Sequence, residues 1–156
     1  MIQRIQTLLL LVAVCLISVM LFLPLATFQV NDVVYLLKAD ALINTMKDNQ
    51  PELVVWPLFI MLIIMILVPL VTIFMFKKRM LQIRLTIFSS ILCVLFYGLF
   101  FYEISAIHKI INPSLISYNY WVLALPLVCI ILNLLAIRRI GQDEMLIRSL
   151  NSNRIR

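Results

Sequence analysis

The chain alternates between four long apolar runs and short polar segments. The runs cover about 8–28, 53–76, 85–102 and 120–137, and none of them contains an acidic, basic or histidine residue. A transmembrane helix needs about 20 apolar residues to cross a hydrocarbon core of roughly 30 Å. We therefore predict four membrane-spanning helices. The first run is longer than the roughly 7–15 residues of a signal-peptide core, which favours a span over a cleaved leader.

The segments between the runs set the expected fold. The connection 77–84 is short, which predicts that the second and third helices are antiparallel neighbours. The expected fold class is an all-α integral membrane protein in which the whole chain, 1–156, forms one antiparallel bundle of four transmembrane helices. The tail 138–156 fits either an amphipathic helix on the membrane surface or a plain extension of the fourth helix.

The segment 29–52 separates the first two runs. In it, Asn31 and Asp32 stand between Val30 and Val33, a pattern typical of a tight β-hairpin. Residues 33–37 fit either a strand or the first turn of a surface helix, because periodicity does not separate the two over so short a stretch. We expect a small hairpin followed by a helical turn.

The distribution of basic residues predicts the orientation of the chain. If both termini share one side, that side holds ten of the 13 lysine and arginine residues. Positive residues resist translocation, so we expect this side, and both termini, to be cytoplasmic. The basic residues that set this topology most clearly are Lys77, Lys78, Arg79, Arg84, Arg138 and Arg139.

The composition excludes a soluble or a disordered chain. Hydrophobic residues make up 64% of the sequence and charged residues 13%, with a mean hydropathy of +1.10, whereas soluble domains are roughly 45–50% apolar and about 25% charged. The net charge of +6 raises the question of nucleic-acid binding. We do not expect it, because the basic residues form short clusters beside the apolar runs rather than a solvated face.

We find no pattern typical of catalysis, metal binding or a cofactor. Cys15, Cys93 and Cys129 lie separately inside apolar runs, so no dithiol is available for exchange chemistry. The runs lack the intramembrane carboxylate or histidine of ion-coupled transporters. Glu103 and His108 are five residues apart, a poor spacing for one helix face, and we expect no catalytic, cofactor-binding or metal-binding residues.

A few polar residues within the runs predict helix packing. Thr86 and Ser90 stand four residues apart, a small-xxx-small spacing that lets another helix approach closely. Asn133 can form a hydrogen bond across helices. These residues are candidates for contacts within the bundle or between copies of the chain.

Three stretches resemble one known family. They are 1–7 (MIQRIQT), 77–85 (KKRMLQIRL) and 135–149 (LAIRRIGQDEMLIRS). Together they are similar to small four-span membrane proteins of the Bacteroidota that are grouped as a domain of unknown function. The resemblance implies four helices, a location in the bacterial inner membrane and no assigned activity.

The function expected from these observations is non-enzymatic. We expect a multi-pass accessory or assembly component that lies in the lipid bilayer and binds other membrane or envelope proteins. Its contact surfaces would be the outer segment 29–52 and the basic loop 77–84. The alternative is a small channel or transporter component formed by a homo-oligomer. An enzyme acting through Glu103 and His108 ranks third.

Overall fold

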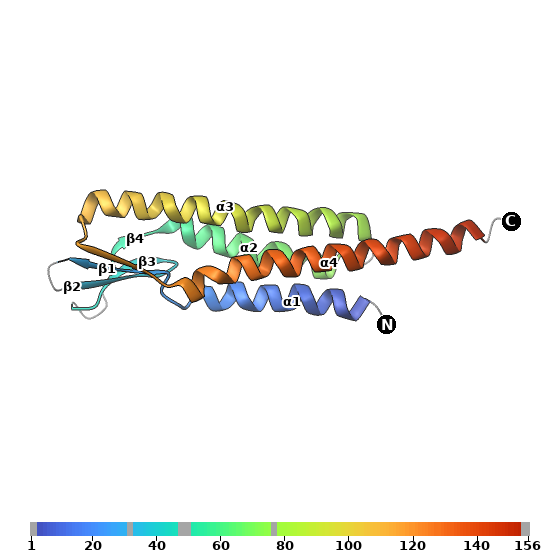
Figure 1. The fold of residues 1–156 in the computed structure, drawn as a ribbon, viewed down its shortest axis with the longest axis horizontal. Coiled ribbons are helices and arrows are strands. Elements are labelled where there is room, and N and C mark those ends of the chain that lie inside the picture. The colour runs from blue at the N-terminus through green and yellow to red at the C-terminus, as the bar shows by residue number, and fades with distance from the viewer. Residues whose placement is uncertain (1–2, 31–32, 47–50, 76–77, 154–156) are drawn as a thin grey trace.

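A computed structural model describes residues 3–30, 33–46, 51–75 and 78–153 of the chain. Within these ranges the protein forms four helices and five strands. The strands gather at one end of the elongated molecule, and the chain begins and ends toward the other end (Figure 1). The helices are α1 (Gln3–Met20), α2 (Trp56–Phe74), α3 (Arg79–Ile111) and α4 (Tyr120–Asn153).

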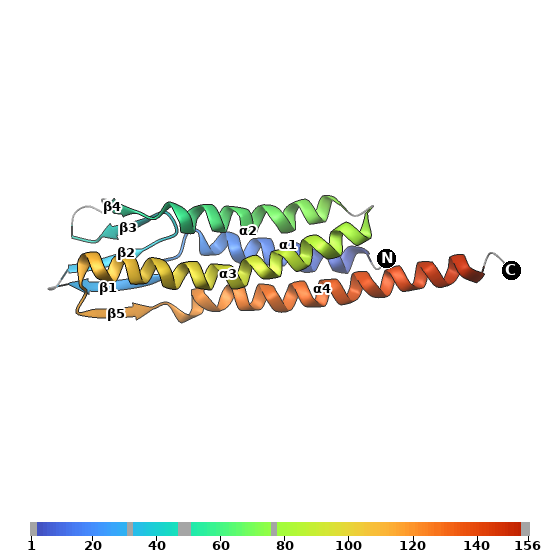
Figure 2. The same ribbon diagram turned by 90° about the horizontal axis from the view of Figure 1, so that it is seen from above.

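The four helices lie side by side along the long axis (Figures 1 and 2). α1 and α3 each pack against both α2 and α4. Within the described chain, three helical stretches are long and apolar enough to cross a membrane, Trp56–Phe74, Arg79–Ile111 and Tyr120–Gln142. Their outward side chains are largely apolar, including exposed Ile64, Leu67 and Ile131. These features indicate a membrane protein. The apolar part of α1, Ile5–Met20, is a shorter helix.

The strands form one antiparallel sheet in the order β4-β3-β2-β1-β5. Figure 2 shows them running roughly along the helix axes rather than across them. Their register includes the pairs Ala26↔Leu37, Leu37↔Leu42 and Ala26↔Tyr118. The strands are β1 (Ala26–Val30), β2 (Val33–Leu37), β3 (Ala41–Asn44), β4 (Pro51–Val54) and β5 (Leu115–Tyr118).

The expectation of an all-α four-helix fold is therefore wrong. The apolar run 8–28 contains two elements, because α1 ends at Met20 and β1 begins at Ala26, beyond Pro24. Residues 33–37 adopt the strand alternative, and the expected helical turn after the hairpin is instead strand β3. Alternating burial explains these strands: Ala26 and Phe28 are buried, while Thr27 is half-buried and Gln29 exposed. The hairpin turn itself, Asn31 and Asp32, lies outside the described residues.

Two helices extend beyond their predicted spans. α3 continues past 102 to Ile111 and lies over one face of the sheet (Figures 1 and 2). Phe28, Leu37 and Leu42 from the sheet share one hydrophobic core with Ile104 and Ile107 from this part of α3. α4 continues without interruption to Asn153, so the tail follows the alternative of an extended fourth helix as far as it is described.

Candidate functional site

The sheet has one buried face and one accessible face. Because side chains alternate along a strand, residues next to the buried Phe28 and Leu37 point to the opposite side of the sheet. On that opposite side Leu115 is 59% exposed, Val54 is 54% exposed and Val34 is also exposed. We call this side the open face, defined by Thr27, Gln29, Val34, Leu36, Ile43, Val54, Leu115 and Ser117.

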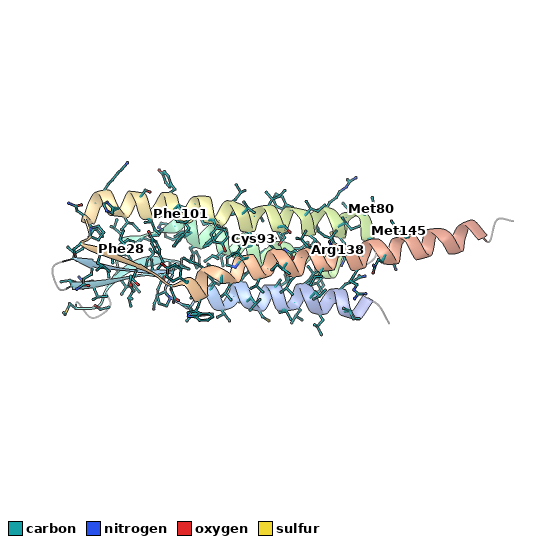
Figure 3. The ribbon with its side chains drawn as sticks, viewed as in Figure 1. Phe28, Met80, Cys93, Phe101, Arg138 and Met145 are labelled. Carbon is teal, nitrogen blue, oxygen red and sulfur yellow. The ribbon has the colours of Figure 1, made fainter. Side chains whose placement is uncertain are left out.

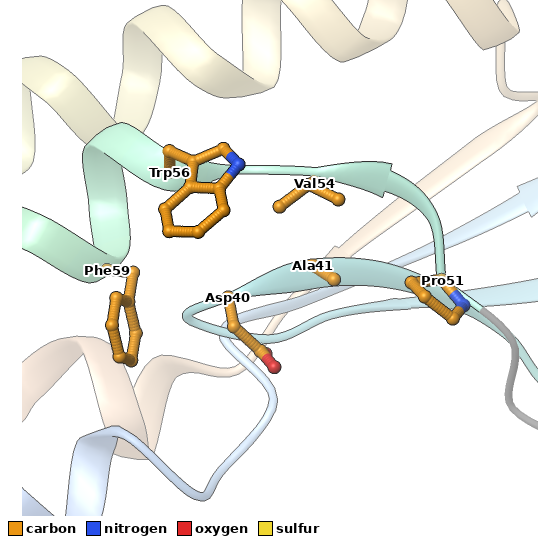
Figure 4. A pocket seen from close by; sticks show the side chains of 6 residues that line it. All are labelled: Asp40, Ala41, Pro51, Val54, Trp56 and Phe59. Atoms are coloured by element: carbon orange, nitrogen blue, oxygen red, sulfur yellow. The ribbon is translucent and has the colours of Figure 1, made fainter.

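Two hollows accompany the open face. The larger, of about 360 Å³, lies where β3 and β4 meet the start of α2. Figure 4 shows the side chains of Trp56, Phe59 and Asp40 around this hollow. The backbone amide of Val55 donates to the carbonyl of Asp40 at 2.9 Å. The lining side chains come from Asp40, Ala41, Pro51, Val54, Trp56 and Phe59. Among the described lining residues, all but Asp40 are apolar or aromatic.

The smaller hollow, of about 220 Å³, lies over the junction of β5, β1 and β2. It is bordered by Leu115 and Ser117 of β5 and by Thr27, Gln29 and Val34 of the neighbouring strands, with Phe28 beneath. Short polar groups and apolar methyl groups alternate around it.

Exposed aromatic side chains mark the level at which the helices meet the sheet, and we call this position along the long axis the aromatic level. Trp121 is 88% exposed, and Trp56, Tyr102 and Tyr120 are exposed as well. Trp and Tyr with this exposure are typical of the interface between membrane and water. The sheet lies beyond this aromatic level, on the side where α1 ends and α4 begins (Figure 1).

A second candidate site is a cluster of buried polar side chains between the helices. It receives residues from all four helices, and each is at most 5% exposed. Gln6, Thr72 and Gln82 lie at the end opposite the sheet, whereas Ser89 reaches toward the middle of α3. We call this set the polar cluster, defined by Gln6, Thr72, Gln82, Thr86, Ser89 and Asn133.

Local hydrogen bonds satisfy the hydroxyl donors of the two threonines in this cluster. The Thr86 hydroxyl donates to the carbonyl of Gln82 at 2.8 Å, and that of Thr72 donates to Val68 at 2.7 Å. The Asn133 amide donates across helices to Ser89 Oγ at 3.1 Å. Its carbonyl oxygen, Oδ1, is buried without a hydrogen-bond partner in the described part of the chain.

Of the residues predicted for helix packing, Thr86 and Asn133 are fully buried between the protein's own helices. Ser90 is half-buried and donates to the Thr86 carbonyl at 3.1 Å. The buried position of Thr86 leaves it no surface to offer to a second copy. Gln6 and Gln82 were not singled out from the sequence, because they border the apolar runs and resemble flanking residues.

Five of the six basic residues predicted to set the topology lie within the described chain and away from the sheet. Lys78 and Arg79 are at the start of α3, Arg84 follows one turn later, and Arg138 and Arg139 are on α4. Figure 3 shows Arg138 far from Phe28 of the sheet. Lys77 lies outside the described residues. The cytoplasmic assignment of this end stays a prediction.

Among the described residues, no group of three or more His, Cys, Asp or Glu side chains could hold a metal ion. Cys93 and Cys129 are buried free thiols and Cys15 is an exposed one. Cys129 donates a weak hydrogen bond to the Ala13 carbonyl at 3.6 Å, which is consistent with a packing role. Glu103 and His108 both lie on α3, where His108 is exposed and Glu103 half-buried.

The comparison with protein families identifies the chain. A family model described as a domain of unknown function, DUF4293, matches residues 2–155. The chain therefore belongs to this family. No curated protein and no solved structure matches it.

Proposed function

We propose that this DUF4293 protein is a four-span protein of the bacterial inner membrane, of the kind found in the Bacteroidota, with both termini in the cytoplasm. Two features support this topology. α1 has 18 residues, close to the 19 of α2, and packs alongside α2 and α4. At about 1.5 Å per residue such a helix spans most of a hydrocarbon core. The basic ends of α3 and α4 then face the cytoplasm and the sheet lies outside the membrane.

The function that we propose is binding of other membrane or envelope proteins by an accessory component without catalytic activity. The observation that carries it is the open face, which stands just outside the aromatic level and exposes Val34, Val54 and Leu115 beside two hollows. Exposed apolar side chains that cluster beside polar ones are typical of interaction sites. The buried face already packs on α3, so the open face remains available for a partner.

The test is cross-linking in native membranes, mild extraction and mass spectrometry of proteins that co-purify with the chain. Val34→Lys together with Leu115→Lys places two charges on the open face, and we expect recovery of a stoichiometric partner to fall strongly. Ile110→Lys is the control, because Ile110 is exposed to an extent comparable with Leu115 but lies on α3. Unchanged recovery with the double variant, at normal abundance in the membrane, would contradict the proposal.

The polar cluster favours a second candidate function, a small channel or transporter component. Neutral hydrogen-bonding side chains inside a membrane helix bundle are typical of both helix packing and polar pathways. Purified protein in liposomes would show a flux that Asn133→Leu abolishes if the cluster conducts. Absence of flux across a panel of ions and small polar solutes would remove this candidate.

A further inference from the structure

The two edges of the sheet differ in how they are protected. β4 begins at Pro51 and pairs with β3 through a register shift at Leu42 and Ile43. Proline and such irregularities prevent further strands from pairing with an edge. β5, at the opposite edge, pairs with β1 in an unbroken register, and Leu115–Tyr118 contains no proline or charged residue. Apart from its short length, β5 has none of the features that keep another strand from pairing with an edge, and this points to a strand partner.

The geometry identifies which backbone groups of β5 have no strand partner at this edge in the described part of the chain. Along an antiparallel strand, the backbone groups of successive residues point alternately to the two neighbouring strands. The Asn119 amide donates to the Leu25 carbonyl at 3.1 Å. By this alternation the backbone N–H and C=O groups of Ser117 and Leu115 also point toward β1. The N–H and C=O groups of Ile116 and Tyr118 therefore point outward from the sheet.

The direction of β5 restricts what can pair with it. Only Asn119 separates β5 from the first residue of α4, Tyr120, which lies at the aromatic level. The strand runs roughly along the helix axes (Figure 2). With about 3.3 Å per residue, its four residues rise about 13 Å above the membrane surface. A segment that pairs with β5 must therefore run parallel or antiparallel to the helix axes, directly outside the bilayer.

We propose that the free edge of β5 binds an extended juxtamembrane segment of a different membrane protein by strand addition. This rests on the proposed binding function and names the partner's chemistry. Antiparallel pairs are slightly more stable than parallel ones, so the segment runs outward and follows a transmembrane helix that leads out of the membrane. β1 is related to β5 in this way already: it follows α1 and pairs antiparallel with β5.

A second copy of this chain does not meet these requirements. Copies in one membrane share their orientation, so a two-fold axis between them lies along the membrane normal. A half-turn about that axis keeps the direction of β5 but exchanges the two faces of the sheet. The two β5 strands would therefore be parallel, and the buried face of one sheet would continue into the open face of the other. Residues at the same height would then direct their side chains to opposite faces, which a regular parallel ladder does not allow.

The side chains beside the edge indicate which segment fits. Ile116 and Tyr118 are half-buried on the side of the core, while Leu115 and Ser117 border the smaller hollow. Every second residue of the bound segment therefore lies beside Ile116 and Tyr118 on the core side of the sheet. The residues between them lie beside Leu115 and Ser117 on the open face. In strand addition, such alternate positions give specificity and the main-chain hydrogen bonds give affinity. The segment should be short, β-branched and free of proline.

The test uses the full chain in native membranes, with a photo-reactive amino acid at position 115 in place of Leu115. Mass spectrometry of the cross-linked peptides locates the attachment. We expect it within the first ten or so residues outside a transmembrane helix of another protein, given the rise of about 3.3 Å per residue. Attachment to a second copy of this chain, to a globular domain of a soluble protein or to lipid alone would overturn the proposal.

Two variants of Ile116 separate the backbone from the side chain. Ile116→Pro removes an outward N–H without removing a hydrogen bond of the sheet, and Ile116→Ala keeps that N–H. We expect the cross-link to fall at least about tenfold with proline, corresponding to roughly 1.4 kcal/mol, and to persist with alanine. Equal yields for the two variants, at equal abundance in the membrane, would overturn strand addition.

A second photo-reactive position distinguishes this proposal from the broader function. Val54 lies on the open face beside the larger hollow, far from β5 in the strand order. Protein cross-links from position 54 with none from position 115 would overturn strand addition and leave partner binding intact. The absence of protein cross-links from both positions would overturn both proposals.

Discussion

Toward the basic end, the space between the helices is lined by the polar cluster. At the sheet end the buried side chains are mostly apolar, among them Met20, Phe28, Phe96 and Phe100, with Asn44 as a buried polar residue. The outer surfaces differ as well. The helices expose apolar side chains such as Ile64, Leu67 and Ile131, while the open face of the sheet mixes apolar side chains with polar ones such as Thr27 and Gln29.

The difference follows from the solvent that surrounds each region. Lipid tails are as apolar as a leucine side chain, so burying leucine between membrane helices yields little, and polar contacts and close packing decide which helices meet. In the topology that we propose, the sheet lies in water and is held on α3 by removal of apolar surface. We therefore expect mutations in the two regions to have effects of different size and origin.

The largest effect is expected at the core of the sheet. Phe28 is fully buried, and Phe28→Ala should destabilise the packing of the sheet on α3 by about 3–5 kcal/mol. Hydrogen exchange of residues 26–44 in nanodiscs measures this loss, and protection of the helices should remain. Leu115→Ala, on the open face, is the control, with an expected change within about 0.5 kcal/mol. Equal effects of both variants would contradict the division into a buried and an open face.

A charge in the polar cluster should have the next largest effect. Asn133 is 1% exposed between the helices, so Asn133→Asp places a carboxylate in a buried position. An aspartate near the centre of a membrane helix raises the free energy of membrane insertion by about 2.5–3.5 kcal/mol. Membrane insertion of α4 and thermal unfolding in detergent measure it. Gln142→Glu makes the same change at an exposed position of α4 and should be tolerated. If Asn133→Asp were equally harmless, the cluster would have to be hydrated.

The end of α3 offers a test of the link between helix and sheet. Asn112 has a left-handed backbone conformation with φ 49°, and its amide donates to the His108 carbonyl at 3.0 Å. Asn112→Ala should reduce stability by roughly 1 kcal/mol, because a Cβ without a polar group is disfavoured in this conformation. Asn112→Gly should be neutral or slightly stabilising. Thermal unfolding in detergent compares the two, and loss of stability with glycine would contradict the role of the backbone angle.

The smallest effect is expected for the hydrogen bond between helices. Ser89→Ala removes the acceptor of the Asn133 amide, and such bonds contribute about 0.6 kcal/mol on average in membranes, with values up to about 1.7. A double-mutant cycle with Asn133→Leu, measured by unfolding in detergent, isolates this coupling. Ser105→Ala on exposed α3 surface serves as the reference. A coupling near zero would show that Asn133 is held by packing alone.

The sequence alone was sufficient to locate the long helices, because each signal is local. An apolar run of about 20 residues can satisfy its own backbone only as a helix when it lies in lipid. The runs around Leu62, Phe96 and Cys129 accordingly became α2, α3 and α4. The basic residues beside these runs were likewise predicted to lie together at one end of the molecule. The structure places Lys78, Arg79, Arg84, Arg138 and Arg139 away from the sheet.

Only the tertiary structure decided the sheet, the open face and the partners within the polar cluster. β5 is four residues long, too short for its alternation to be recognised, and it becomes a strand because Ala26 pairs with Tyr118 from a distant part of the chain. Asn133 was recognisable as a polar residue in a span, but its bond to Ser89 depends on how α3 and α4 are rotated against each other. Pairing and rotation are set by contacts between segments far apart in sequence, which no local pattern encodes.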